Sequence, residues 1–404
     1  MQLHFPTDAG DNAITSEDET ILDIKKIYVE EAAYDFPRTY EVLEEFFGAE
    51  VINVDSHWKL EELNQNPEMI SQWTQVKSHV LVLGVKSSIA TRANGRSTDF
   101  ISPSISNGCT GACAYCYVAR RKGYANPITH FVNHEKIMAH MERKAKKLGP
   151  KTITEACANS ISSKSCPITV ESLAQTCPDF WTFDIGENSD ISVDAELSDT
   201  VYEVIQMFAG LDNAKACFAT KFVNPNMLLY DPQGNTRIRF SLMPQNVSTT
   251  VDVRTSPITD RIEAINDFVE AGYEVHINLS PVIIYSGWKK DYADLLTQID
   301  DTLSDAAKQQ LKAEVIMLTH NEKLHELNME WHPKAEEQFL WRHWDSPDHK
   351  EFNRFGRTVI QQKKLSQNGM VNIRYKNKPK REAIEDLKDL VNSIIPYCSV
   401  RYAF

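Results

Sequence analysis

Three cysteines with a close, fixed spacing carry the clearest chemical signal in the sequence. Cys109, Cys113 and Cys116 follow a C-x3-C-x2-C pattern within the segment NGCTGACAYCY. Thiolates are iron ligands, and iron–sulfur clusters usually take four of them. Gly108 and Gly111 allow the backbone of this loop to curl. The pattern therefore predicts a loop that holds three irons of an iron–sulfur cube and leaves the fourth iron open.

No fourth cysteine lies near enough to complete the set, since the next one in the chain is Cys157. A zinc loop is the alternative for the same residues. Zinc sites usually combine C-x2-C with a second His/Cys pair at a distance, and neither His130 nor His134 completes a familiar spacing. The iron–sulfur interpretation is therefore favoured.

Alternating strand-like and helix-like segments surround this loop and must position it. We expect strands over residues 79–85, 180–184, 216–222, 238–242, 274–279 and 313–318. We expect helices over residues 131–148, 200–208, 258–271 and 288–303, and a hairpin followed by a helix over 381–394 near the C-terminus. Repeated strand–helix units imply right-handed crossovers and a parallel sheet with helices outside. About six units fit a partial (β/α)6-type barrel, where chemistry gathers at the C-terminal ends of the strands.

Length and composition indicate a globular intracellular protein. The chain has 404 residues, of which 42% are hydrophobic and 25% charged, so it can bury a large core. No stretch approaches the roughly 20 apolar residues that cross a bilayer. The first 20 residues lack the basic and apolar parts of a signal peptide, so we expect a cytoplasmic location, or the host cytoplasm if the protein is encoded by a phage. Eight cysteines in so long a chain are too few for a disulfide scaffold.

Charge is distributed unevenly and suggests three regions. The net charge is -13, but residues 1–80 hold 17 acids and 5 bases and account for nearly all of it. The segment from Lys350 to Arg381 contains ten basic residues and only one acidic residue, which permits a polyanionic partner there. We expect an acidic, helical N-terminal extension over 1–76, the barrel over 77–345, and a basic hairpin and helix over 346–404.

The cysteine spacing is the signature of the radical S-adenosylmethionine (SAM) enzymes, which this chain resembles. That resemblance implies a 4Fe–4S cluster on Cys109, Cys113 and Cys116, with SAM on the open iron. It also implies an external electron donor such as flavodoxin or ferredoxin. The protein then positions the cofactor and excludes water and competing hydrogen donors.

Over residues 77–404 the chain resembles the spore photoproduct lyase family, which reverts a thymine–thymine dimer in DNA. The similar segments are KSHVLVLGV, PITHFVN, ATKF, TSPITDRIEAINDFVEAG and NRFG, in that order. The resemblance implies a radical SAM enzyme that abstracts hydrogen from a thymine-derived base in DNA. The basic hairpin then supplies candidate phosphate contacts, whose affinity falls with salt. These candidates are Arg354, Arg357, Lys363 and Lys364.

The family also implies roles around SAM. Tyr115 and Tyr117 match two tyrosines that relay hydrogen, although both are equally suited to shielding the cluster from solvent. Ser189, Lys221 and Ser241 match segments that line SAM. A lysine at a strand end often extends to solvent, and serines at strand ends are common caps. The alternative for each of these residues is therefore a purely structural role.

The resemblance breaks where the lyase carries its hydrogen-donor cysteine, because Glu187 occupies that place. A carboxylate has no weak bond to hydrogen, so two hypotheses remain. In the first, a repair lyase takes its hydrogen from Cys217, which shares a strand face with Lys221. In the second, an isomerase rearranges the C5 substituent of a hypermodified thymine of phage type, without an external donor. Glu187 would then bind a substrate amine.

A third interpretation has no catalysis. The cluster would be structural, and the chain would be a DNA-binding iron–sulfur protein. Reductive cleavage of SAM distinguishes this interpretation from the other two.

Overall fold

The protein is described from a computed structural model. The described residues are 22–58, 60, 63, 73–94, 97–116, 118, 127–151, 177, 179–340, 360–365 and 371–404. Among the helices in these ranges, none combines the length and apolar character that a membrane span requires.

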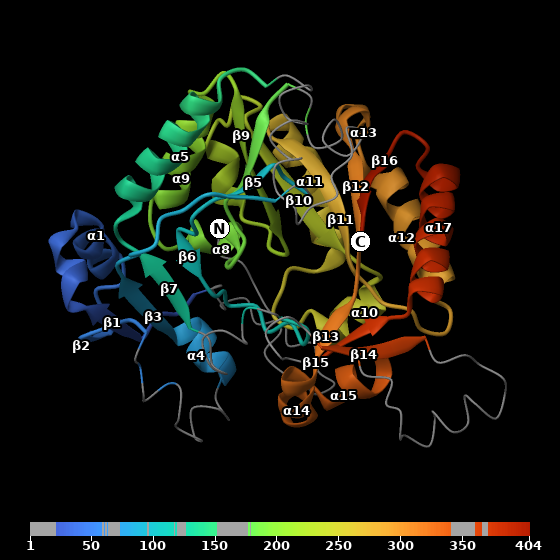
Figure 1. Ribbon diagram of the computed structural model, residues 1–404, viewed down its shortest axis with the longest axis horizontal. Helices are drawn as coiled ribbons and strands as arrows, with labels where there is room; N and C mark the ends of the chain where they lie inside the picture. Colours follow the sequence, from blue (N-terminus) through green and yellow to red (C-terminus); the bar gives the residue numbers. More distant parts are fainter. Residues whose placement is uncertain are drawn as a thin grey trace.

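The largest sheet in the described part has eight strands in the order β16-β12-β11-β10-β9-β8-β5-β4. Every neighbouring pair is parallel except β4 with β5. Its strands are β4 (Arg92–Ala93), β5 (Phe100–Ile101), β8 (Trp181–Asp184), β9 (Ala214–Thr220), β10 (Thr236–Leu242), β11 (Glu274–Val282), β12 (Lys312–Met317) and β16 (Ser399–Ala403). All of β10 is buried, as expected for a parallel strand covered on both faces. Figure 1 shows that this sheet curls into an open barrel.

Helices cover the outer face of the curled sheet (Figure 1). The long ones are α5 (His134–Leu148), α9 (Thr200–Ala209), α11 (Ile258–Glu270), α12 (Trp288–Thr302) and α17 (Asn377–Ile394). Shorter helical segments also connect the strands: α8 (Ile191–Asp194), η3 (Pro225–Leu229), α10 (Gln245–Val251) and α13 (Asp305–Gln310). In α11, Ile258, Ile262 and Ile265 recur at helical spacing and are buried in the barrel core. The alternation of strand and helix thus follows the hydrophobic period of the sequence.

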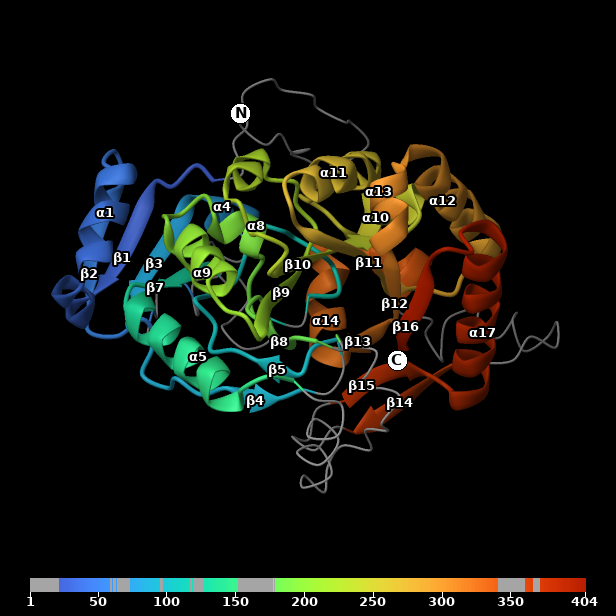
Figure 2. The same cartoon turned by 90° about the horizontal axis from the view of Figure 1, so that it is seen from above.

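A second sheet has the order β2-β1-β3-β7-β6 and lies at one end of the molecule (Figure 2). Its strands are β1 (Lys26–Glu30), β2 (Glu50–Val54), β3 (Val80–Gly84), β6 (Ser106–Asn107) and β7 (Ile128–Phe131). Between β1 and β3 run η1 (Glu31–Asp35), α1 (Pro37–Glu45) and α4 (Trp73–His79). Its apolar core, which includes Leu81 and Leu83, also receives Phe222 from beyond β9, so it joins the barrel.

The third sheet is a small antiparallel one in the order β13-β15-β14. It consists of β13 (Thr319–Asn321), β14 (Gln361–Leu365) and β15 (Val371–Tyr375). The helical segments α14 (Glu322–Trp331), α15 (Pro333–Ala335) and the π-helical turn η4 (Glu336–Leu340) lie beside it (Figure 1).

The fold confirms the predicted α/β partial barrel and differs from the prediction at both ends. The N-terminal region is not purely helical, because β1 and β2 pair there, and the 79–85 strand joins them as β3 rather than opening the barrel. In the C-terminal region β14 pairs antiparallel with β15, and β16 then returns to the barrel beside β12. The pairings of β1 with β3 and of β16 with β12 therefore cross both predicted domain boundaries.

Candidate active site

The cysteine loop begins directly after the short strand β6, and backbone hydrogen bonds attach it to two other segments. Gly108 N–H donates to the carbonyl of Asn188 at 2.8 Å, and Ala114 N–H donates to the carbonyl of Val251 at 2.8 Å. Gly108 has φ 88°, in the left-handed region that favours glycine. The loop is thus held between the turn after β8 and the C-terminal end of α10.

The three thiols lie close enough for their charges to interact. Burial raises the pKa of Cys109 to about 12, which Lys77 opposes and a charged Cys116 increases. Burial also raises the pKa of Cys113 well above its ordinary range, and the nearby Asp252 adds to the effect. The thiols of Cys109 and Cys113 therefore stay protonated until a metal ion binds and displaces their protons, as expected of cysteines that ligate a metal.

The shape of the loop fits a bound cluster. A Cβ at Gly111 would lie 3.4 Å from Cys109 Sγ and 3.3 Å from Cζ of Phe222, tighter than most side-chain contacts. A larger residue at position 111 would require the Phe222 ring to move by a few tenths of an ångström. None of the three cysteines forms a disulfide. All three thiols are thus available, and three is the number that leaves one iron open.

Tyr115 and Lys221 meet at a buried carboxylate beside the loop. The Tyr115 hydroxyl donates to Asp252, and the Lys221 ammonium lies 5.4 Å from the Tyr115 ring centre. Burial raises the pKa of Tyr115 well above its ordinary range, and the Asp252 charge adds to it, so the phenol is neutral. Burial lowers the pKa of Lys221, but the charges of Asp252, Cys113 and Asp190 together outweigh this and hold the pKa above its ordinary value. Lys221 is thus a cation directed at the loop, which does not fit the alternative of an outward-facing lysine.

Arg261 links the same carboxylate to the end of β10. Its Nη1 lies 3.4 Å from Oδ2 of Asp252 and donates to the carbonyl of Ser241 at 2.7 Å. The Ser241 side chain is buried at the C-terminal end of β10. The sequence prediction missed Asp252 and Arg261 as site residues. The only signal for Arg261 was its place in the family-like segment over 255–272.

Ser189 and two aspartates join the ends of β8 and β9. Ser189 forms an isolated bridge with Gly108 and donates to Asp194 Oδ2 at 2.6 Å. Asp190 caps α8 and accepts from the Thr220 hydroxyl at 2.7 Å and from Lys221 N–H at 3.0 Å. Ser189, Lys221 and Ser241 thus all lie at strand ends on the side of the cysteine loop.

Glu187 lies in the turn after β8 and is already engaged. It forms an ion pair with Arg92 and accepts from Asn188 Nδ2 at 3.3 Å. Burial lowers the pKa of Lys86, while the Glu187 carboxylate opposes that shift, so a second cation is nearby. An amine of a substrate would have to compete with these cations for Glu187.

Cys217 is fully buried in the middle of β9. Asp184 and Arg237 flank it on the neighbouring strands β8 and β10. Burial raises the pKa of Cys217, and Arg239 opposes the shift. Four residues separate Cys217 from Lys221, which is roughly 13 Å along a strand. Lys221 follows the end of β9, so the shared strand face stays a prediction, and Cys217 lies in the middle of the strand, away from the end where Lys221 meets Tyr115.

The basic C-terminal candidates are only partly described. Tyr117, Arg354 and Arg357 lie outside the described residues. Lys363 and Lys364 are exposed on β14, and because they are adjacent they point to opposite faces of the hairpin. Lys363 pairs with Glu322 at 2.8 Å.

Comparison with known proteins decides the family. The family model described as spore photoproduct lyase matches residues 23–178 and 167–403. The chain belongs to the spore photoproduct lyase family. Spore photoproduct lyase of Bacillus subtilis (strain 168) is 27% identical over 293 residues, covering 72% of this chain and 77% of the relative. That of Geobacillus sp. (strain Y412MC61) is 22% identical over 381 residues, covering 94% and 98%.

Solved structures of the family share the fold. Spore photoproduct lyase complexed with dinucleoside spore photoproduct superposes with a TM-score of 0.76 at 20% identity, covering 95% of this chain and 100% of that chain. A variant with bound AdoMet and dinucleoside spore photoproduct gives the same values. Family membership confirms the expected radical SAM enzyme, with a 4Fe–4S cluster and SAM as its cofactors.

Proposed function

We propose that this chain binds the cluster through Cys109, Cys113 and Cys116 and abstracts hydrogen from a thymine-derived base in DNA. When bound, the cluster and SAM together supply a 5′-deoxyadenosyl radical. The observation that carries the proposal is the position of the cysteine loop in a member of this family. The loop bonds to the turn after β8, its Tyr115 contacts Lys221 at the end of β9, and Asp252 and Arg261 connect Tyr115 with the end of β10. In barrels of this kind the chemistry occurs at those ends.

The side chains around the loop divide the work of holding SAM and controlling hydrogen. Lys221 offers a cation that suits a carboxylate such as that of SAM. Ser189 and Ser241 offer hydrogen-bonding groups at the adjoining strand ends. Tyr115 stays a neutral phenol beside Lys221, so it keeps the O–H bond that a hydrogen relay needs. Tyr117 is proposed for the same relay from the family resemblance.

A thymine-derived base fits because solved relatives bind dinucleoside spore photoproduct. A base inside a duplex must be extruded to reach a buried radical centre. The exposed lysines Lys363 and Lys364, with Arg354 and Arg357, are the proposed phosphate contacts. Electrons would come from a flavodoxin- or ferredoxin-type protein, which dithionite replaces in the experiment.

A second candidate function is rearrangement of a thymine whose C5 substituent carries an amine. Two observations favour it: Glu187 stands where the family's donor cysteine is expected, and Cys217 is fully buried at a distance from the loop. A substrate amine would replace Arg92 as the partner of Glu187. The substrate radical would then recover its hydrogen from 5′-deoxyadenosine, so no thiol would be required.

The experiment supplies the reconstituted enzyme with SAM, dithionite and two oligonucleotides in heavy water. One oligonucleotide carries a thymine–thymine dimer, and the other carries an aminated C5-substituted thymine. Repair with hydrogen from a thiol or phenol would give separated thymines that contain one solvent deuterium. Rearrangement would give an isomer without solvent deuterium, identified by fragmentation because its mass is unchanged. If 5′-deoxyadenosine forms but neither oligonucleotide changes, the proposed substrate class is wrong.

A further inference from the structure

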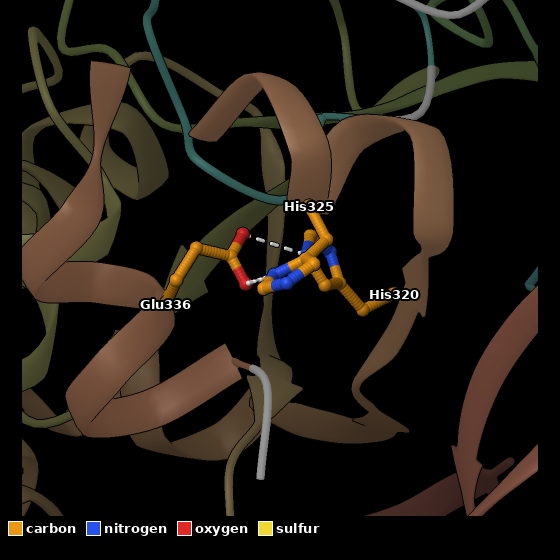
Figure 3. Close-up of side chains that lie close together, drawn as sticks. All are labelled: His320, His325 and Glu336. Atoms are coloured by element: carbon orange, nitrogen blue, oxygen red, sulfur yellow. Dashed lines mark hydrogen bonds and ion pairs between the residues drawn. The ribbon is translucent and has the colours of Figure 1, made fainter. Parts of the chain in front are cut away.

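A second set of metal-ligand side chains lies apart from the cysteine loop, in the segment that follows β12. His320 lies on β13, His325 on α14, and Glu336 at the start of the π-helical turn η4. Their ligand atoms all lie within 4.8 Å of one another. Figure 3 shows both imidazole rings facing the same carboxylate.

The carboxylate lies between the two rings. His320 Nε2 is 2.7 Å from Glu336 Oε1, and His325 Nδ1 is 2.8 Å from Glu336 Oε2. The side chains of His320 and Glu336 are almost completely buried, while that of His325 is 13% exposed. The site is therefore withdrawn from solvent but has one ligand near the surface, through which an ion can enter.

We propose that His320, His325 and Glu336 bind one divalent transition-metal ion such as zinc. Two imidazoles and one carboxylate form a known zinc ligand set, with a fourth position left for water. Calcium and magnesium prefer all-oxygen sites, so the two nitrogen ligands disfavour them. Each ring would present the nitrogen that now faces Glu336 without a proton: a protonated ring would release that proton to solvent, and a neutral ring would carry its proton on the other nitrogen.

The spacing of the ligand atoms suits such an ion after a small adjustment. Two ligands at 2.0–2.1 Å from zinc in tetrahedral geometry are roughly 3.4 Å apart. The two His–Glu distances of 2.7 and 2.8 Å, which run to different oxygens of Glu336, would each lengthen by about 0.6 Å, and all the ligand atoms already lie within 4.8 Å of one another. Rotation of side chains provides a movement of this size without a change in the backbone.

Asn328 connects this site to the cysteine loop. Its Nδ2 donates to Glu336 Oε1 at 2.6 Å and to the carbonyl of Ala114 at 2.5 Å. Ala114 lies between Cys113 and Cys116. Groups that hydrogen-bond to a metal ligand fix its orientation. A zinc ion that holds Glu336 would therefore also hold Asn328, and through it the backbone of the cysteine loop.

The test measures zinc directly in the full chain with its cluster reconstituted. After incubation with zinc sulfate and removal of the excess, zinc and iron are quantified by mass spectrometry, and zinc-edge X-ray absorption gives the ligands. We expect one zinc per chain, with nitrogen and oxygen ligands at about 2.0–2.1 Å. In His325→Ala and in Glu336→Gln we expect zinc retention to fall at least tenfold while iron is unchanged. His140→Ala, on α5, is the matched control and should keep its zinc.

Three results would overturn the proposal. They are the absence of zinc from the wild type, zinc retention in both ligand variants equal to that of the wild type, and sulfur ligands at about 2.3 Å. The last result would place the ion on the cysteine loop. Iron content and circular dichroism verify that each variant is folded. If His325→Ala does not fold, Glu336→Gln alone is compared with the wild type. Hydrogen exchange of the peptide over residues 109–116 tests the link through Asn328. Zinc removal should speed that exchange, and unchanged protection would show that the ion does not hold the loop.

Discussion

The hydroxyl of Tyr115 donates a hydrogen bond to the carboxylate of Asp252, which stands 137 positions later in the chain. The same carboxylate attracts Lys221 and lies 3.4 Å from Arg261. One buried acid therefore connects the cysteine loop with the ends of β9 and β10. This connection, which the sequence pattern does not reveal, brings the family's candidate residues together.

Replacing Asp252 by Asn should destabilise the protein by about 3 kcal/mol, because Arg261 would be left as a buried cation without its partner. Tyr115→Phe removes one hydrogen bond and should cost about 1 kcal/mol. Urea unfolding followed by tryptophan fluorescence measures both changes. Asp294→Asn, at an exposed ion pair on α12, is the control and should stay within about 0.5 kcal/mol of the wild type. Equal stability of Asp252→Asn and this control would contradict the assigned role of Asp252.

Two substitutions separate repair from rearrangement. If Cys217 donates hydrogen, Cys217→Ala should abolish turnover of the dimer or give aberrant adducts while SAM cleavage continues. If the enzyme rearranges an aminated thymine, Glu187→Gln should lose most activity, because a neutral amide binds an ammonium group less strongly than a carboxylate does. Product analysis by mass spectrometry measures both. Because Cys217 is fully buried, we expect Cys217→Ala to keep its activity and Glu187→Gln to lose it. The opposite pattern would support the repair hypothesis.

Asp194, the acceptor of the Ser189 hydrogen bond, should make stability depend on pH. Burial raises its pKa from 3.8 to about 7, with Ser189 opposing the shift. The folded state therefore holds the Asp194 proton more tightly than the unfolded state does. The stability that this proton contributes is lost as pH rises from about 4 through about 7. Asp194→Asn never ionises and lacks this loss. Its stability relative to the wild type should increase over that range, by up to roughly 4 kcal/mol, and then level off. If the free energies of unfolding of the two proteins differed by the same amount at every pH from 4 to 8, the raised pKa of Asp194 would be refuted.

Salt dependence tests the basic hairpin. Lys364 is exposed, whereas the neighbouring Lys363 is paired with Glu322. If Lys364 contacts a phosphate, Lys364→Ala should reduce the slope of log affinity against log salt by about 0.9 and weaken all DNA sequences alike. Fluorescence anisotropy with a labelled duplex measures the slope. Lys290→Ala, at an exposed ion pair on α12, is the matched control. An unchanged slope for Lys364→Ala would exclude the contact.

The barrel could be predicted from the sequence because its strands and helices follow hydrophobic periods. The helix over 258–271 and the strand over 238–242 were placed within a few residues of α11 and β10. The pairing of β1 with β3 could not be predicted in the same way. Each strand carries only a short apolar run, and nothing local indicates a partner some fifty residues away.

The site was predictable only as far as motif spacing reaches. Cys109, Cys113 and Cys116 are close in the chain, so their grouping is a local property. Asp252 is brought to Tyr115 by tertiary packing alone, and its residue type has no distinctive pattern. The ion pair of Arg92 with Glu187 likewise joins residues that are 95 positions apart. The pairing of Glu187 with Arg92 could therefore not be predicted from the sequence.

The most direct test of the account is reductive cleavage of SAM. The protein is reconstituted with iron and sulfide without oxygen, mixed with SAM and dithionite, and analysed for 5′-deoxyadenosine by liquid chromatography and mass spectrometry. We predict that the wild type and Cys398→Ala, which changes a buried cysteine outside the loop, form this product, and that Cys113→Ala forms none above background. A wild type that forms none, or a Cys113→Ala variant that forms as much as the wild type, would contradict the central claim.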